Sequence, residues 1–219
     1  MSEVEKIVSI CHKVYEKGFV SAYDGNVSAI TPGNTVLFTR SGVCKGDVTA
    51  EDILEFDMNG SLLKGEGKIT TEFKLHLFAY SRRPDVNAVV HCHPVHATAF
   101  SLVGEGIIEH YFPEVILTLG KIPLCKYGTP STNDLPLSLE PYIEHSWAYL
   151  LQNHGAITLG KTLDDAYYKM EKLEHSAETI FKARMLGNPN TLSKEDITQL
   201  LKISEETYGI KIDPRNIYD

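Results

Sequence analysis

Residues 87–94 read NAVVHCHP, and this stretch carries the strongest indication of both fold and chemistry. Its apolar, β-branched start predicts a buried strand over residues 88–93, followed by a helix from about residue 96. Because side chains alternate along a strand, His91 and His93 would point to the same face of the sheet. Two imidazoles at that spacing can bind one metal ion.

A third histidine follows another predicted strand. His154 lies in the stretch QNHG (residues 152–155), just after a strand expected at residues 147–152. It could add a third nitrogen to a site for a divalent ion such as Zn²⁺, with one position left open for substrate. The His-x-His pair alone is equally compatible with ordinary packing histidines. A further histidine directly before a glycine, at a strand end, favours metal binding.

The rest of the chain alternates between helical and extended patterns. Further strands are expected between residues 23 and 56 and at residues 121–125 and 156–159. Asn59-Gly60 predicts a hairpin with a type I′ turn. Together these patterns favour a single α/β domain over residues 1–219, with a largely antiparallel or mixed sheet in layers with helices. Helices are expected at residues 4–15, 71–83, 131–144 (split or kinked at Pro136 and Pro141), 163–186 and 193–207.

Composition and charge argue against several kinds of function. The 219 residues carry 29 acidic and 21 basic side chains, a net charge of -8, which is unfavourable for binding nucleic acid. Basic stretches are short and no apolar run approaches about 18 residues, so no membrane interaction is expected. The four cysteines form no C-x-x-C pair, and the N-terminus has no signal-peptide pattern. We therefore expect a cytoplasmic protein with reduced thiols, and a small anionic substrate remains compatible.

Three polar segments could bind such an anion. Thr70-Thr71-Glu72 opens a predicted helix, where backbone N–H groups and hydroxyls suit a phosphate and the carboxylate suits a metal ion or proton transfer. The glycine turns DGNVS (residues 24–28) and TRSG (residues 39–42) could bring further N–H groups close to a ligand. Each segment alone is typical of an ordinary helix start or turn. Their presence beside three histidines favours a binding site.

Taken in order, these segments resemble the class II aldolase and adducin family, most closely its L-fuculose-1-phosphate aldolase type. The resemblance runs from the first helix to Tyr208-Gly209. It implies a nine-stranded, mostly antiparallel sheet between helical layers, and a four-fold symmetric homotetramer with its sites between subunits. The motifs that carry it are GNVS (residues 25–28), SG (41–42), TTE (70–72), NAVVHCH (87–93) and QNHG (152–155).

The resemblance also implies a role for each motif. His91, His93 and His154 would bind zinc, or another divalent metal such as Mn²⁺ or Co²⁺. Glu72 would be a metal ligand at rest and the catalytic acid/base once substrate displaces it. The substrate phosphate would be held by Gly25, Asn26, Ser41, Gly42, Thr70 and Thr71.

Two tyrosines match further family positions. Tyr111 would donate a proton to the aldehyde-side oxygen from a neighbouring subunit, a reasonable role for a group whose pKa is near 10. Tyr208 would shape the pocket for the aldehyde.

The implied reaction is metal-dependent retro-aldol cleavage of a ketose 1-phosphate, similar to L-fuculose 1-phosphate, to dihydroxyacetone phosphate and a small aldehyde such as lactaldehyde. Glu72 favours this reaction over L-ribulose-5-phosphate 4-epimerase, whose branch usually has aspartate there. The family usually has serines in place of Thr70-Thr71 and the aldolase has threonine in place of Ser41, so the sugar stays open. Alternatives are aldolases acting on 5-deoxyribulose 1-phosphate or 5-methylthioribulose 1-phosphate, and methylthioribulose-1-phosphate dehydratase. The complete histidine and glutamate set disfavours a non-catalytic adducin-like module.

Overall fold

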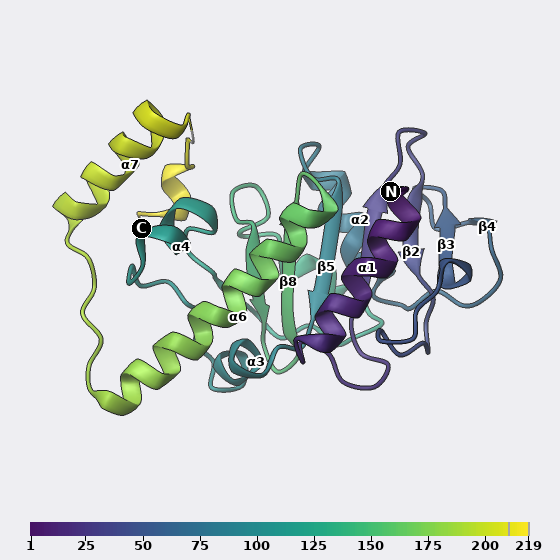
Figure 1. Cartoon of the computed structure of the whole chain (residues 1–219), viewed down its shortest axis with the longest axis horizontal. Coiled ribbons are helices and arrows are strands. Elements are labelled where there is room, and N and C mark those ends of the chain that lie inside the picture. Colours follow the sequence, from purple (N-terminus) through teal and green to yellow (C-terminus); the bar gives the residue numbers. More distant parts are fainter. Residues whose placement is uncertain (210, 219) are drawn as a thin grey trace.

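The computed structural model describes residues 1–209 and 211–218 and is built around one eight-stranded sheet (Figure 1). The strands lie in the order β4-β3-β2-β1-β5-β8-β7-β6, and all neighbours are antiparallel except β6 and β7. This confirms the predicted α/β class and the mostly antiparallel sheet, with eight strands in the described residues where the family resemblance implied nine. The strands are β1 (Asn26–Ile30), β2 (Val36–Thr39), β3 (Ile53–Phe56), β4 (Leu62–Lys64), β5 (Ala88–Cys92), β6 (Leu124–Cys125), β7 (Ala148–Leu151) and β8 (Gly155–Gly160).

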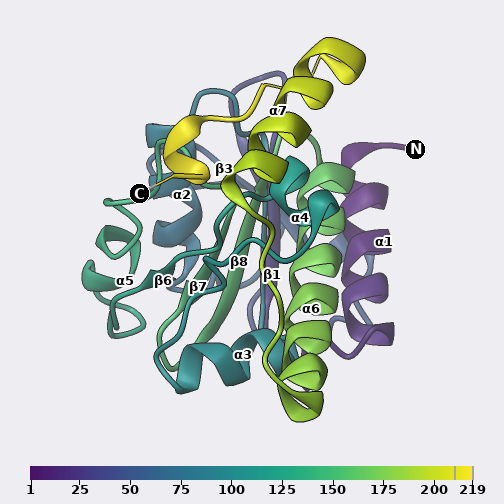
Figure 2. The same cartoon turned by 90° about the vertical axis from the view of Figure 1, so that its left-hand side faces the viewer.

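Helices cover both faces of this sheet (Figures 1 and 2). Helices α1 and α6 pack on one face, with α3 beside them, and α2 and α5 pack on the other. The expected helical layers are therefore present. The helices are α1 (Glu3–Glu16), α2 (Phe73–Arg82), α3 (Val95–Leu102), α4 (Pro113–Thr118), α5 (Asp134–Leu137), α6 (Leu163–Leu186) and α7 (Lys194–Tyr208), with 3-10 turns η1 (Ala50–Asp52) and η2 (Pro214–Asn216).

Strand β5 lies inside the sheet and is buried on both faces. Val90 belongs to the apolar cluster beneath α1 and α6, whereas Val89 belongs to the cluster beneath α2 and α5. A strand covered on both sides shows a continuous apolar run in its sequence, which is the pattern seen before His91. The histidine pair is thus attached to a strand that is buried along its whole length.

Some expected elements differ in extent. The strand predicted at residues 121–125 is reduced to β6, and the helix predicted at residues 131–144 is reduced to α5 and a series of turns. Pro136 and Pro141 lack an N–H group, so they cannot donate the bonds that a continuous helix requires. Short α4 and η2 were not predicted.

The hairpin at Asn59-Gly60 forms as expected between β3 and β4, but the predicted type I′ turn is wrong. Only Gly60 has a positive φ, of 88°, and the Asp57 N–H donates to Ser61 O at 3.0 Å to close a longer loop. The Asp57 carboxylate accepts hydrogen bonds from the N–H groups of Asn59 (2.9 Å) and Ser61 (2.7 Å). This side chain stabilises an alternative turn, as aspartate commonly does.

The C-terminal part lies beside the sheet rather than on it (Figure 1). Ser193 and Asp196 form the capping box expected at the start of α7. A small cluster of Ile116, Ile197 and Ile217 joins α4, α7 and the segment after η2. Among the helices of the described chain, none has the length and apolar character needed to cross a membrane. All four cysteines are free thiols.

Candidate metal centre

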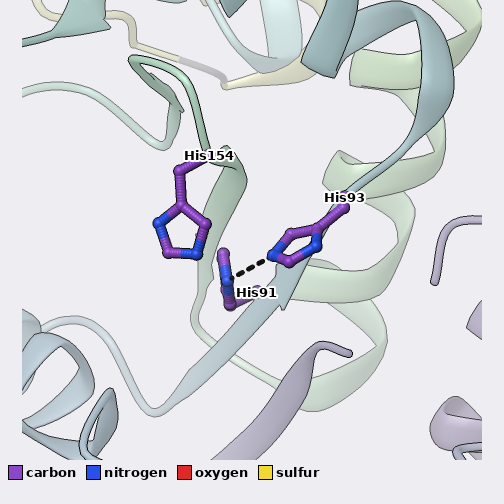
Figure 3. Close-up of side chains that lie close together, drawn as sticks. All are labelled: His91, His93 and His154. Atoms are coloured by element: carbon purple, nitrogen blue, oxygen red, sulfur yellow. Dashed lines mark hydrogen bonds between the residues drawn. The ribbon is translucent and has the colours of Figure 1, made fainter. Parts of the chain in front are cut away.

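The three predicted histidines converge at one end of β5 and β8 (Figure 3). His91 lies in β5, His93 follows its last residue, and His154 lies in the turn that leads into β8. Their candidate ligand nitrogens all lie within 4.8 Å of one another, and His91 Nε2 is 3.1 Å from His93 Nε2. Gly155 makes this convergence feasible, because a Cβ there would lie 2.5 Å from His93 Cδ2.

Glu72, directly before α2, completes the cluster. It is the N-cap residue of α2, but its carboxylate does not cap the helix and faces the histidines instead. The Glu72 N–H donates to Thr70 Oγ1 at 3.4 Å. Glu72 Oε1 is 3.1 Å from His154 Nε2, and Oε2 is 3.5 Å from His91 Nε2. Asn26 Nδ2 donates to Glu72 Oε2 at 2.7 Å and so orients the carboxylate.

The protonation states suit a metal ion. Burial lowers the pKa of His91 to about 3, despite the opposing effect of Glu72, so its imidazole is neutral at physiological pH. Burial also lowers the pKa of His93. Burial by itself would raise the pKa of Glu72, but His91, His154 and the Asn26 hydrogen bond outweigh that effect and hold the pKa well below its usual value. Neutral imidazoles and an ionised carboxylate are the forms that bind metals.

The geometry of these donors fits one ion. Two nitrogens bound to a single tetrahedral Zn²⁺ are about 3.3 Å apart at ordinary bond lengths, close to the His91–His93 separation of 3.1 Å. His91 Nδ1 lies 2.9 Å from Ala156 O, so that nitrogen carries the proton and Nε2 is left as the ligand. Asn26 Oδ1 is buried without a hydrogen-bond partner and Asn26 lines the adjoining cavity, a further sign that the site is arranged for a bound group.

A polar cavity of about 190 Å³ adjoins the cluster, with Glu72 and His93 in its wall. It brings together most of the residues predicted to bind phosphate: Gly25, Asn26, Ser41, Gly42 and Thr70. Thr71 is not in its wall, because the Thr71 hydroxyl lies 2.7 Å from Ser131 Oγ on the protein surface. A larger cavity, of about 760 Å³, lies near the C-terminal segment, and none of the predicted site residues lines it.

Two cations in the wall of the smaller cavity were not predicted. Arg40 is paired with Asp52. Lys45 is only 2% exposed, and its ammonium donates to Val43 O at 2.8 Å and to Tyr23 O at 3.4 Å. No carboxylate in the described part of the chain lies within ion-pair distance of Lys45. Since it follows a glycine turn without any motif of its own, only the folded structure reveals this buried charge.

Tyr111 is not brought to the cluster within this chain. Tyr111 packs against the apolar cluster beneath α6 and interacts with the side chain of Arg184. It does not line the cavity beside Glu72. Tyr208 ends α7, and its side chain lies outside the part of the structure that is described.

Residues 5–181 match the family model described as Class II Aldolase and Adducin N-terminal domain. The chain belongs to the class II aldolase and adducin family. The match includes every residue of the histidine cluster and of the adjoining cavity.

The chain is similar to an aldolase and to a decarboxylase of this family. An L-fuculose phosphate aldolase of Methanococcus maripaludis (strain C7) is 36% identical over 171 residues, which is 78% of this chain and 92% of the relative. A 3-oxo-tetronate 4-phosphate decarboxylase of Pectobacterium atrosepticum is 31% identical over 202 residues, 89% of this chain and 90% of the relative. Among solved structures, an L-fuculose 1-phosphate aldolase has the same fold, with a TM-score of 0.84 and 24% identity over 91% of this chain and 94% of that one.

Proposed function

We propose that this member of the class II aldolase family is a metal-dependent aldolase that cleaves a ketose 1-phosphate similar to L-fuculose 1-phosphate. The products would be dihydroxyacetone phosphate and a small aldehyde such as lactaldehyde. The observation that carries the proposal is the position of Glu72, which contacts two histidines of the cluster and lines the polar cavity. A carboxylate there can exchange a proton with a substrate whose phosphate occupies the cavity.

In this proposal, separate residues would bind the metal ion, transfer the proton and hold the phosphate. His91, His93 and His154, with Glu72 at rest, would hold Zn²⁺ or a similar ion such as Mn²⁺ or Co²⁺. When bound, the ion would supply Lewis acidity that stabilises the negative charge left on the dihydroxyacetone phosphate half after carbon–carbon cleavage. Glu72 would accept and return the proton, while the turns at Gly25–Asn26 and Ser41–Gly42 and the Thr70 hydroxyl would hold the phosphate.

Other parts of the proposal concern the assembly. Tyr111 lies away from the cluster of its own chain, which is compatible with a proton-donating role in the site of a neighbouring subunit of a homotetramer. Tyr208 would shape the aldehyde pocket, and Thr71 would act beside Thr70 after turning from Ser131. The enzyme would work in the cytoplasm on a small phosphorylated sugar.

Decarboxylation of a 3-oxo acid phosphate is the second candidate, because a relative with that name matches 89% of the chain. Both reactions break a carbon–carbon bond to the carbon next to a carbonyl group. Both leave negative charge on the fragment that holds this carbonyl, and a Lewis acid can stabilise that charge. The histidine cluster and the cavity are compatible with either. The substrates differ in their leaving group, which is an aldehyde in one case and carbon dioxide in the other.

Zinc-loaded protein is expected to release dihydroxyacetone phosphate from L-fuculose 1-phosphate, and a chelator should abolish the release until zinc is restored. A coupled assay for dihydroxyacetone phosphate measures this directly. The same protein should be offered 5-deoxyribulose 1-phosphate, 5-methylthioribulose 1-phosphate and L-ribulose 5-phosphate. Carbon dioxide release from 3-oxo-tetronate 4-phosphate, without cleavage of any ketose phosphate, would replace the aldolase with the decarboxylase.

Replacing Lys45 with methionine is expected to weaken phosphate binding, because it removes a buried positive charge from the cavity wall. Hydrogen bonds to charged groups contribute strongly to binding free energy, so we expect inorganic phosphate to bind roughly tenfold more weakly. We also expect the substitution to raise KM more than it lowers kcat. The readout is the inhibition constant of inorganic phosphate. Lys64→Met, an exposed lysine on β4, is the matched control. An unchanged inhibition constant in a folded Lys45→Met protein would remove Lys45 from the phosphate site.

A further inference from the structure

The outward-facing nitrogens of the three histidines have different surroundings. His91 Nδ1 faces a backbone carbonyl at 2.9 Å, and His154 Nδ1 is buried without a partner. His93 Nδ1 alone faces a carboxylate, with Asp24 Oδ2 3.6 Å away. A histidine that binds metal through Nε2 carries its proton on Nδ1, and that proton requires an acceptor.

The segment before β1 brings Asp24 to this point. The ladder between β1 and β5 ends with Asn26 opposite His91; Asp24 lies two residues before this pair and His93 two residues after it. The chain turns at Gly25, whose φ is 74°, and the Asp24 carboxylate then faces His93. Asn26 orients Glu72 in the same region, and Asp24 lies beside His93.

Two backbone contacts hold the opposing segments together beyond the ends of their strands. The His93 N–H donates to Phe19 O at 2.9 Å. Gly25, with a φ of 74°, lies so close that a Cβ would be 2.9 Å from His91 O. The separation of Asp24 and His93 is therefore set by the backbone, while the half-exposed Asp24 side chain can rotate to close a distance of 3.6 Å to a hydrogen bond.

We propose that Asp24 is a positioning residue for the metal centre: it accepts a hydrogen bond from His93 Nδ1–H and holds the ring with Nε2 directed at the other two histidines. Asp24 is not itself a ligand, because it lies on the side of the ring opposite to the nitrogen that faces His91. A carboxylate in the wall of a cavity suited to phosphate is unfavourable for anion binding. The contact with His93 explains why a carboxylate is present in this wall, whichever phosphorylated substrate is bound.

The role of Asp24 rests on the proposed metal centre, so the test measures metal affinity and not turnover. Zinc dissociation constants are measured for the full-length apo protein by competition with a chromophoric chelator. Loss of an outer hydrogen-bond partner typically weakens metal binding by 10–100-fold, and we expect Asp24→Ala to fall in about that range. Asp24→Asn should lose less, because its amide oxygen can still accept the bond. Asp47→Asn, an exposed aspartate without a histidine contact, should match the unaltered protein.

A nitrogen-15 NMR spectrum of the zinc-loaded protein tests the contact itself. The Nδ1–H proton of His93 is expected to be protected from exchange in the unaltered protein and in Asp24→Asn, and to exchange rapidly in Asp24→Ala. An unchanged zinc affinity in Asp24→Ala overturns the proposal for Asp24 alone. Equal losses in Asp24→Ala and Asp47→Asn also overturn it, because they indicate a general charge effect. Failure of the unaltered protein to bind zinc overturns the metal centre as a whole.

Discussion

Replacing Glu72 with glutamine is expected to lower kcat for ketose-phosphate cleavage by roughly a thousandfold, the contribution of a well-placed general acid/base. Glutamine has the shape of glutamate but cannot take up a proton at its amide. Its oxygen can still accept the hydrogen bond that Asn26 Nδ2 donates at 2.7 Å. The three imidazoles are unaltered, so zinc content should stay close to one ion per chain.

The measurement pairs kcat with zinc content determined by mass spectrometry on the same sample. Glu66→Gln is the matched control, since Glu66 is exposed and lies outside the cavity wall. Near-normal turnover in Glu72→Gln would show that another group transfers the proton. Loss of zinc together with turnover would instead make Glu72 chiefly a ligand.

Local sequence patterns predicted much of this structure because the forces behind them are local. The apolar spacing of α6 identifies its bounds, Leu163–Leu186, as predicted, and Gly187 follows directly. The burial of β5 on both faces gives its continuous apolar run, and the period of two aligns His91 with His93. The histidine cluster could be predicted for the same reason, since each member lies at the end of a recognisable strand.

Features set by distant parts of the chain were beyond local patterns. The Thr71 hydroxyl lies against Ser131, sixty residues away, and nothing near Thr71 indicates this contact. Buried Lys45 donates to Tyr23 O, which lies 22 residues earlier in the chain. Asp24 faces His93 because the segment before β1 and the end of β5 meet in the assembled sheet. Strand pairing and register depend on the whole sheet, so these relationships appear only once it is assembled.

The two cores also explain why the site residues lie where they do. The cluster beneath α1 and α6 and the cluster beneath α2 and α5 cover the two faces of β5, whose end carries His91 and His93, and the turn before β8 carries His154. Glu72 comes from the α2 side, whereas Gly25 precedes β1. Elements from separate layers thus meet around one polar cavity. A rigid frame of this kind holds catalytic groups in a fixed arrangement without immobilising the substrate-facing turns.

Replacing His91 with alanine is expected to remove zinc and activity together. His91 is fully buried and contacts both His93 and Glu72, so it lies at the centre of the donor set. Zinc binding to a site of four ligands has a large favourable free energy, and each ligand contributes to it. Loss of one ligand should therefore weaken zinc affinity by at least about a hundredfold. The deleted ring also leaves a polar cavity that water can fill, which limits the loss of stability.

The zinc dissociation constant of apo His91→Ala, measured by chelator competition, is the primary readout, and thermal unfolding confirms that the protein is folded. His175→Ala is the control, because His175 is an exposed histidine on α6 outside the cluster. Glu72→Gln and His91→Ala should then separate two functions, with proton transfer lost in the first and metal binding lost in the second. Unchanged zinc affinity in folded His91→Ala would contradict the three-histidine centre. It would then direct attention to ligands outside the cluster formed by His91, His93 and His154.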